Sequence, residues 1–318
     1  MTYVLLIVGF ALLIKGADYF VEGASSIARA LKVSPLLIGL TIVAFGTSSP
    51  EATVSIVAAL EENAGVAVGN VVGSNIFNIT LVVGLTALIN PLTVENETIR
   101  KEIPFTFLAS AVLLVLISDA ALHGFNENFI TRSDGLIFLL FFSIFLYYIF
   151  EVARKSREAV KEEKETRETV SWSKNGLLTI GGLAAIIFGG ELVVNHATEI
   201  AYSFGMSETL VGLTIVAVGT SLPELITSIT AAMKRESEIA LGNIVGSNIF
   251  NIFFVLGSAS VISPLAVDSK IYIDVLLLMM ITVVLFIFSR THFTIGKREG
   301  FILSVAYILY MVYILMRN

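Results

Sequence analysis

Residues 39–51 read GLTIVAFGTSSPE and residues 212–224 read GLTIVAVGTSLPE, so one stretch occurs twice in the chain at an offset of 173. The repeat continues at the same offset, because residues 69–79 read GNVVGSNIFNI and residues 242–252 read GNIVGSNIFNI. Both copies keep Thr, Ser, Pro, Glu and Asn inside otherwise apolar segments. Polar residues in such surroundings are energetically costly and usually functional. The sequence therefore predicts one functional site to which both copies contribute.

The composition around these segments predicts a membrane protein. Of the 318 residues, 56% are hydrophobic and only 14% are charged, whereas a soluble domain is about half apolar and about a quarter charged. Apolar runs of about twenty residues, which can cross a bilayer as helices, recur along the chain. The expected fold class is therefore all-α integral membrane, with ten transmembrane helices. We expect them at residues 3–30, 35–60, 65–90, 103–120, 131–152, 175–202, 207–233, 237–263, 271–289 and 297–316.

The basic residues predict how these spans face the membrane. Of the 20 Lys and Arg residues, 16 fall in one set of connections and three in the opposite set with the C-terminal tail. Connections rich in Lys and Arg stay on the cytoplasmic side. We therefore expect a multi-pass protein of the plasma or inner membrane, with both termini outside and the charged loop 153–174 in the cytoplasm.

This loop divides the chain into two predicted five-helix repeats, residues 1–152 and residues 175–318. A half with an odd number of spans must face opposite ways in its two copies. The internal similarity therefore implies an inverted repeat. A two-fold axis in the membrane plane would bring both polar segments together near the middle of the membrane.

Glu51 and Glu224 are the residues that point most directly to function. A carboxylate in lipid must be protonated, paired with a base or neutralised by a bound cation. The second, third, seventh and eighth spans contain no Lys, Arg or His at comparable depth. A cation is therefore favoured over a salt bridge, and a protonated structural glutamate is the alternative.

Hydroxyl and amide oxygens accompany each glutamate at helical spacing, on its own span or on the next one. Oxygen ligands without sulfur or imidazole suit hard cations such as Ca²⁺ or Na⁺, and Ca²⁺ takes roughly six to eight of them. Interhelical hydrogen bonding is the alternative role for these groups. The set comprises Thr47, Ser48, Ser55, Asn70, Ser74 and Asn78 in the first copy, and Thr220, Ser221, Ser228, Asn243, Ser247 and Asn251 in the second.

Proline predicts a break in each helix that carries a glutamate. Pro50 and Pro223 lack an N–H, so the carbonyl group four residues earlier loses its helical partner. Broken transporter helices use such freed carbonyls to bind cations, whereas a simple packing kink is the alternative. The carbonyl groups concerned lie near Ala44, Gly46, Ala217 and Gly219.

Two further patterns lie outside this set. The glycine spacings 65–69–73 and 242–246 predict close helix packing rather than a ligand site. Acidic residues in the first and sixth spans are secondary candidates for an ion path, and Lys15 is spaced to pair with Asp18. These acids are Asp18, Glu22, Glu191 and Glu199.

The twin GTSxPE segments, each followed by GNxxGSNIFNI, resemble the two α-repeats of the calcium/cation antiporter superfamily, and most closely those of prokaryotic sodium/calcium exchangers. The motifs cover about 36–79 and 209–252, and the ten-span layout extends the resemblance over the whole chain. The resemblance implies an exchanger that is driven by sodium entry and extrudes calcium without covalent chemistry. The ions would be cargo, with no cofactor, and the first and sixth spans would slide over the others to switch access.

The resemblance also implies residue roles. Glu51 and Glu224 would bind calcium, assisted by the carbonyls of Thr47 and Thr220. Asn78 would border the centre together with its counterpart, Asn251, where some relatives carry Asp. Sodium would contact Glu51 and Glu224 together with Ala44, Ser48, Ser74, Ala217, Ser221 and Ser247.

Three other functions remain to be weighed. A calcium/proton antiporter would titrate the same carboxylates, and a cation channel would conduct without a counter-ion. An intramembrane enzyme is disfavoured because the sequence contains neither HExxH nor GxSxG. No basic, aromatic-interleaved patch indicates nucleic acid, so the expected partners are inorganic cations and the lipid bilayer. The sequence does not fix the oligomeric state, and a monomer is compatible with it.

Overall fold

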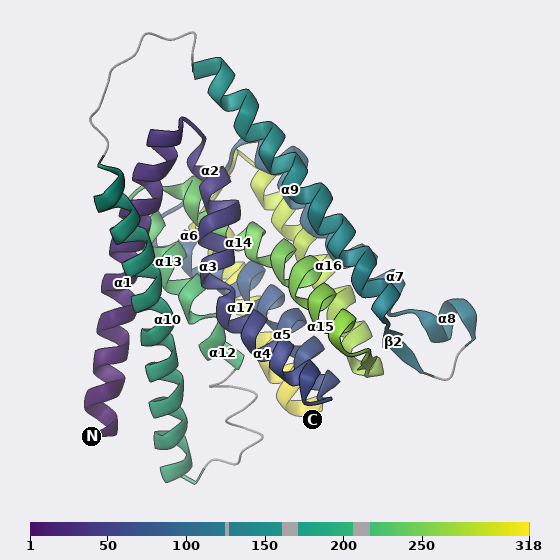
Figure 1. The fold of residues 1–318 in the computed structure, drawn as a ribbon. Coiled ribbons are helices and arrows are strands. Elements are labelled where there is room, and N and C mark those ends of the chain that lie inside the picture. Colours follow the sequence, from purple (N-terminus) through teal and green to yellow (C-terminus); the bar gives the residue numbers. More distant parts are fainter. Residues whose placement is uncertain (125–126, 161–170, 206–216, 318) are drawn as a thin grey trace.

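A computed structural model describes residues 1–124, 127–160, 171–205 and 217–317 (Figure 1). These residues are almost entirely helical, which confirms the expected fold class at that level. The first part of the chain contains α1 (Thr2–Leu31), α2 (Pro35–Ile38), α3 (Ala44–Thr47), α4 (Ser49–Leu60), α5 (Ala64–Phe77), α6 (Val83–Ile89), α7 (Ile103–Leu116), α8 (Asp119–His123) and α9 (Arg132–Val160). The second part contains α10 (Trp172–Ser203), α12 (Ala217–Thr220), α13 (Leu222–Met233), α14 (Ser237–Phe250), α15 (Gly257–Ile262), α16 (Ser269–Arg290) and α17 (Lys297–Arg317).

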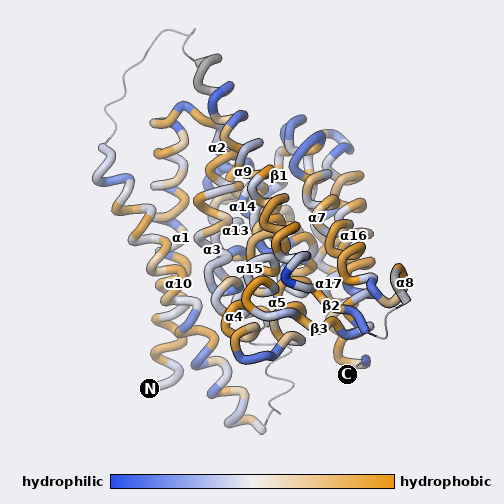
Figure 2. The backbone as a smooth tube through the Cα atoms, turned by 45° about the vertical axis from the view of Figure 1, so that its right-hand side comes forward, coloured by the Kyte–Doolittle hydropathy of each residue, from blue (hydrophilic) through white to orange (hydrophobic). Residues whose placement is uncertain are grey.

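Within the described residues, seven helices are long and apolar enough to cross a membrane, and a bent pair brings the number to eight. Their limits lie within a few residues of the predicted spans, although α9 continues to Val160 and makes the start of the predicted loop helical. The predicted span 207–233 lies partly outside the described residues, which include residues 217–233 of it as α12 and α13. Hydrophilic turns gather towards the two ends of the bundle, with apolar helices between them (Figure 2). This distribution fits a protein that crosses a bilayer.

Side-chain caps explain where several helices begin. Ser34 accepts a hydrogen bond from the N–H of Leu37, and Pro35 follows it at the first helical position of α2. Asp268 accepts from the N–H of Lys270 at the start of α16. Such caps satisfy N–H groups that have no partner within the helix.

Each motif helix is interrupted beside its glutamate. The segments Pro35–Thr47 and Ser49–Leu60 meet at an angle of 48°, and the break falls at Ser48. In the second motif, Ser221 has a similar non-helical backbone between α12 and α13 (φ −91°, ψ 7°, against −83° and 7° at Ser48). Both breaks precede a proline by two residues, where the missing N–H and the proline ring disfavour a continuous helix.

The spans that follow α4 and α13 in the sequence form the centre of the molecule. In the most apolar 18-residue window of each span, 94% of the residues of Ser237–Ile262 and 72% of those of Ala64–Ile89 are buried, against 33% in both Thr2–Leu31 and Trp172–Ser203. Wider π-helical turns occur at η1 (Gly39–Val43), η2 (Asn78–Val82), η3 (Thr98–Glu102) and η5 (Asn251–Leu256). The turns η2 and η5 begin at equivalent asparagines of the two motifs, and turns of this kind are frequent at functional sites.

The helices α1 and α10 lie side by side at one edge of the molecule (Figure 1). A Cβ atom on Gly9 would lie 3.0 Å from the carbonyl oxygen of Gly189, and one on Gly16 would lie 2.9 Å from that of Gly182. Since rising numbers on α1 meet falling numbers on α10, the two helices run antiparallel. We call the contact formed by Gly9, Gly16, Gly23, Gly182 and Gly189 the glycine seam.

Two short antiparallel ribbons, which the sequence did not predict, join connections from the two parts of the chain. β1 (Leu92–Thr93) pairs with β4 (Thr294–Ile295). β2 (Asn128–Ile130) pairs with β3 (Leu265–Val267). Runs this short carry no strand periodicity, because only two or three residues are paired.

The expected glycine packing has a mixed outcome. A Cβ on Gly242 would lie 2.6 Å from the carbonyl oxygen of Leu36, and one on Gly246 would lie 2.7 Å from that of Leu40, so this pair permits close packing as predicted. No described atom lies within 4 Å of a Cβ placed on Gly65, Gly69 or Gly73. The segment of the second motif equivalent to 36–40 is 209–213, which lies outside the described residues, so close packing of these three glycines stays a prediction.

Candidate cation-binding site

Glu51 and Glu224 occupy equivalent positions in the first turns of α4 and α13, directly after the two helix breaks. Both side chains are fully buried. Among the described residues, neither carboxylate has an ion pair with Lys, Arg or His. The charge of these two groups is therefore not balanced by a basic side chain in the part of the chain that the structure describes.

The serines at the two breaks connect the glutamates crosswise. The hydroxyl of Ser48 donates to Oε1 of Glu224 at 2.7 Å, and the hydroxyl of Ser221 donates to Oε1 of Glu51 at 2.8 Å. Ser221 also lies 3.0 Å from the hydroxyl of Ser74 on α5. We call these five residues the central cluster. Because each break presents its serine to the glutamate of the other motif, neither motif completes the cluster alone.

One oxygen of each glutamate is left free. Oε2 of Glu51 and Oε2 of Glu224 are buried and have no hydrogen-bond partner among the described residues. Unpaired buried acceptors of this kind are rare and costly unless a ligand satisfies them. The described residues contain no cluster of three or more His, Cys, Asp or Glu side chains that could hold a metal. A cation at this site would therefore depend on two carboxylates and neutral oxygens.

The threonines before the breaks are held by asparagines of the opposite motif. The hydroxyl of Thr47 donates to Oδ1 of Asn243 at 2.9 Å, and that of Thr220 lies 3.5 Å from Oδ1 of Asn70. The amide nitrogen of Asn70 also donates to the carbonyl oxygen of Glu51 at 3.2 Å. These asparagines thus make the interhelical hydrogen bonds that were the alternative to direct ion binding. They support the helices that carry the glutamates.

The other expected ligands lie on the same elements. The hydroxyl of Ser247 lies 3.5 Å from the carbonyl oxygen of Ala44, which also accepts from the N–H of Ser48 at 3.0 Å. Gly46 and Gly219 are both buried and precede the breaks in α3 and α12. Ala217 begins α12, and the placement of its side chain lies outside the described features.

Asn78 and Asn251 are fully buried one helical turn beyond Ser74 and Ser247. The side-chain oxygens Oδ1 of both asparagines have no hydrogen-bond partner among the described residues. With the two glutamates, they provide four unpaired acceptor oxygens from equivalent positions of the two motifs. Two other buried asparagines, Asn75 and Asn248, contact them. The sequence predicted no role for Asn75 and Asn248, although they are also polar residues that both copies keep.

The secondary acidic candidates lie apart from this cluster. Glu22 and Glu191 are exposed on α1 and α10. Glu199, also exposed, accepts from the hydroxyl of Thr2 at 2.9 Å. The expected pairing of Asp18 with Lys15 is wrong, because the partner of Asp18 is Lys234 at 2.6 Å. Lys234 directly follows the end of α13. The ion pair therefore joins α1 to a different helix instead of linking two positions of α1.

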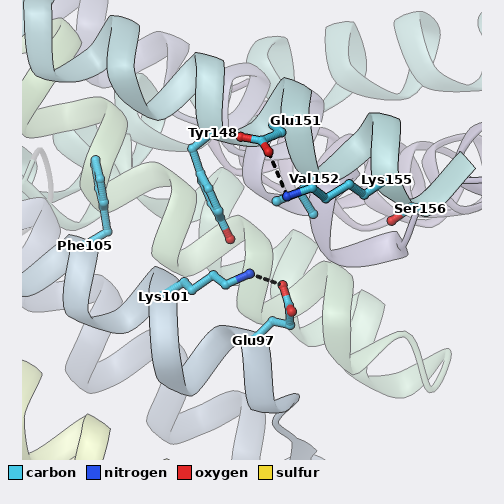
Figure 3. A pocket seen from close by; sticks show the side chains of 8 residues that line it. All are labelled: Glu97, Lys101, Phe105, Tyr148, Glu151, Val152, Lys155 and Ser156. Atoms are coloured by element: carbon cyan, nitrogen blue, oxygen red, sulfur yellow. Dashed lines mark hydrogen bonds and ion pairs between the residues drawn. The ribbon is translucent and has the colours of Figure 1, made fainter. Parts of the chain in front are cut away.

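A cavity of about 610 Å³ lies elsewhere, between η3, α7 and α9 (Figure 3). Lys101 pairs with Glu97 and Lys155 pairs with Glu151, both at 2.7 Å, so its charged groups already have partners. Tyr148, which lines the cavity, donates a hydrogen bond to the buried Glu102. The cavity contains no residue of either motif, and we do not connect it with ion binding.

The sequence model of the family described as sodium/calcium exchanger protein matches residues 1–151 and 174–316. The chain belongs to this family, and the resemblance drawn from the two motifs is confirmed. The chain is 38% identical over 317 residues to the inner membrane protein YrbG of Escherichia coli, covering 96% of this chain and 94% of that protein. It is 36% identical over 343 residues to the sodium/calcium exchanger MaX1 of Methanosarcina acetivorans, covering 98% and 97%.

The fold is similar to that of a solved family member. The structure of the sodium-calcium exchanger NCX_Mj soaked with zero Na⁺ and Ca²⁺ superposes with a TM-score of 0.83, at 31% sequence identity and 98% coverage of both chains. Agreement over nearly the whole length means that the similarity includes the peripheral helices as well as the motifs.

Proposed function

We propose that this chain is a secondary active antiporter that exchanges sodium for calcium by alternating access and extrudes calcium. The observation that carries the proposal is the buried pair Glu51 and Glu224, which has no basic partner among the described residues and one free oxygen on each carboxylate. One Ca²⁺ balances two carboxylates, and several Na⁺ can do the same. The family and the names of its members supply the identity of the two ions.

In this proposal the ligands follow the motif positions. Calcium binds Glu51 and Glu224 with the carbonyl groups of Thr47 and Thr220, and Asn78 and Asn251 line the centre. Pro50 and Pro223 have no N–H to donate to the carbonyls of Gly46 and Gly219, which we propose as further ligands. Sodium uses the two glutamates with Ala44, Ser48, Ser74, Ala217, Ser221 and Ser247. The ions are cargo, and no covalent step is involved.

Burial of the carboxylates supplies a physical reason for coupling. An empty site would hold two buried carboxylates without compensation, which makes its closure costly. Calcium or sodium offsets that charge, so the loaded protein can pass between outward-facing and inward-facing states. Only loaded forms then cross, and this restriction enforces exchange.

We further propose that the chain forms ten spans in two inverted five-helix halves, 1–152 and 175–318. Three reciprocal features support this architecture. Serines and glutamates bond crosswise between the motifs. In the glycine seam, Gly9 and Gly16 meet Gly189 and Gly182, which lie at the repeat offset of 173 from Gly16 and Gly9. The ribbons β1–β4 and β2–β3 likewise pair each half with the other.

The sidedness is part of the same proposal. Both termini lie outside the cell membrane and the loop 153–174 lies in the cytoplasm, as the distribution of Lys and Arg favours. Cysteine substitutions at Thr2 and at Lys164 test this assignment in intact cells, because the chain has no native cysteine. An impermeant thiol reagent should label the first variant and not the second.

The transport proposal is tested with the purified full-length chain in liposomes. We expect ⁴⁵Ca²⁺ to enter vesicles loaded with sodium when they are diluted into sodium-free medium, and not to enter vesicles loaded with choline. Entry driven by a pH gradient alone would instead identify a calcium/proton antiporter. Entry that needs no counter-ion gradient would identify a channel.

A further inference from the structure

Four asparagines from the two motifs meet in the centre of the molecule. Asn75 and Asn78 lie at the junction of α5 and η2, and Asn248 and Asn251 lie at the junction of α14 and η5. All four are fully buried. Asn78 and Asn251 border the proposed ion site, whereas Asn75 and Asn248 have no role in the proposed function.

A chain of hydrogen bonds begins at the backbone and ends at the ion site. The amide nitrogen of Asn75 donates to the backbone carbonyl oxygen of Asn248 at 3.1 Å. Oδ1 of Asn75 then accepts from the amide nitrogen of Asn251 at 3.2 Å. Oδ1 of Asn251 is left without a partner among the described residues. Asn251 follows Ser247 by one helical turn and shares its face of the helix.

The direction of these hydrogen bonds matters because the two ends of a side-chain amide are chemically different. The amide oxygen accepts hydrogen bonds and can bind a cation. The NH₂ group donates hydrogen bonds and repels a cation. A backbone carbonyl can only accept, so it fixes which end of Asn75 is the nitrogen. The oxygen of Asn75 in turn fixes the nitrogen of Asn251, because the opposite orientation would set two oxygens against each other.

The equivalent hydrogen bond, between Asn78 and Asn248, has no backbone carbonyl that fixes its direction. The amide nitrogen of Asn78 donates to Oδ1 of Asn248 at 3.2 Å. The amide nitrogen of Asn248 has no partner among the described residues. Both amides can therefore turn together and keep a hydrogen bond between them. The two motifs, which are nearly identical in sequence here, differ in how firmly they fix the lining amide.

We propose that Asn75 is a positioning residue that holds the amide oxygen of Asn251 towards the transported cation. This role rests on the proposed function, since it requires a cation at the central cluster. Asn75 does not touch the ion, and it acts through the orientation of Asn251 alone. Partners that orient metal ligands in this way typically change metal affinity by about 10–100-fold when they are removed.

The first measurement is calcium binding to the purified full-length chain, by equilibrium dialysis with ⁴⁵Ca²⁺ in sodium-free buffer. We expect Asn75→Leu, which keeps the volume and removes both hydrogen bonds, to weaken calcium binding about tenfold. Asn248→Leu is the matched variant, and we expect a smaller loss because its amide is not anchored. If Asn75→Leu does not fold, Asn75→Ala serves in its place.

The second measurement separates orientation from a merely structural role. In an Asn251→Asp background both ends of the side chain are oxygens, so no wrong orientation exists. In that background Oδ1 of Asn75 faces an oxygen instead of an NH₂ group, so we expect Asn75→Leu to cause no loss of calcium affinity relative to the background. A structural role for Asn75 would give the same fold-loss with Asn or with Asp at position 251.

The outcomes distinguish this inference from the function on which it rests. An unaltered chain that binds no calcium would overturn the proposed function and the role of Asn75 with it. Calcium binding by the unaltered chain, with equal losses for Asn75→Leu in both backgrounds, would overturn only the role of Asn75. Equal losses for Asn75→Leu and Asn248→Leu would contradict the anchoring argument.

Discussion

The two motif-bearing parts of the chain meet in the central cluster and in the glycine seam, and the chemistry of these contacts is opposite. In the central cluster, hydroxyl groups of one motif donate to carboxylates of the other, and both glutamates are fully buried. In the glycine seam, backbone approaches backbone, and a Cβ on Gly182 would lie 2.6 Å from the backbone nitrogen of Phe20. The cluster is central, and the seam joins two helices at the edge of the molecule.

This difference indicates which property each contact controls. The cluster contains unpaired acceptors, which add little to folding and are suited to a ligand. The seam offers close apolar packing and leaves no room for a larger side chain. Substitutions that remove one of these unpaired acceptors should therefore change ion transport with little effect on folding, whereas those in the seam should change stability first.

The largest effect is expected for Glu51→Gln and Glu224→Gln. The amide keeps the shape of the side chain but removes a charge that the cation needs. We expect each variant to lower sodium-driven ⁴⁵Ca²⁺ uptake by at least about a hundredfold. Thermal unfolding in detergent should show that both variants remain folded. Undiminished uptake by either would place the ion site elsewhere.

A smaller loss is expected when the crossed hydrogen bonds are removed. Ser48→Ala and Ser221→Ala each take a donor from a buried carboxylate, an interaction worth about 1.5–3 kcal/mol. We expect the apparent affinity for calcium to fall about tenfold in each variant. Ser49→Ala is the control, because the hydroxyl of Ser49 donates to the carbonyl oxygen of Phe45 within the same motif. Equal losses at positions 48 and 49 would contradict the crosswise arrangement.

The sequence predicts some residues of the site and does not predict others. Glu51 and Glu224 are recognisable because a charged residue in an apolar run requires a partner. The role of Asn75 is not, because Asn75 and Asn248 stand at equivalent positions and only the structure shows which amide has a backbone anchor. The partner of Asp18 was also missed, because Lys234 is distant in the sequence and belongs to a different helix.

The fold also has features that follow from the sequence and features that do not. The long helices follow from apolar runs, and the breaks follow from proline in each motif. The pairing of α1 with α10 is harder to predict from the sequence. The seven-residue spacing of Gly9, Gly16 and Gly23 indicates a close helix contact but does not identify the partner helix. The ribbons are two or three residues long and depend on connections that tertiary packing brings together.

The seam itself is tested at two neighbouring glycines of α10. Gly182 faces α1, whereas no described atom lies within 4 Å of a Cβ on Gly181. We expect Gly182→Ala to destabilise the protein by about 1–3 kcal/mol, because the helices must separate to admit the methyl group. Gly181→Ala should be neutral or slightly stabilising, since alanine favours a helix over glycine. Similar melting temperatures for the two variants would contradict the packing of α1 on α10.

The smallest effect is expected at the ion pair between Asp18 on α1 and Lys234 after α13. Their side chains keep 40% and 30% of their exposure, so water and salt screen the attraction. A double-mutant cycle of Asp18→Asn and Lys234→Gln should give a coupling free energy of about 1 kcal/mol or less in thermal unfolding. The coupling should decrease as ionic strength rises. A larger coupling that resists salt would mean that this pair is shielded from solvent, and that α1 is fixed by charge as well as by the glycine seam.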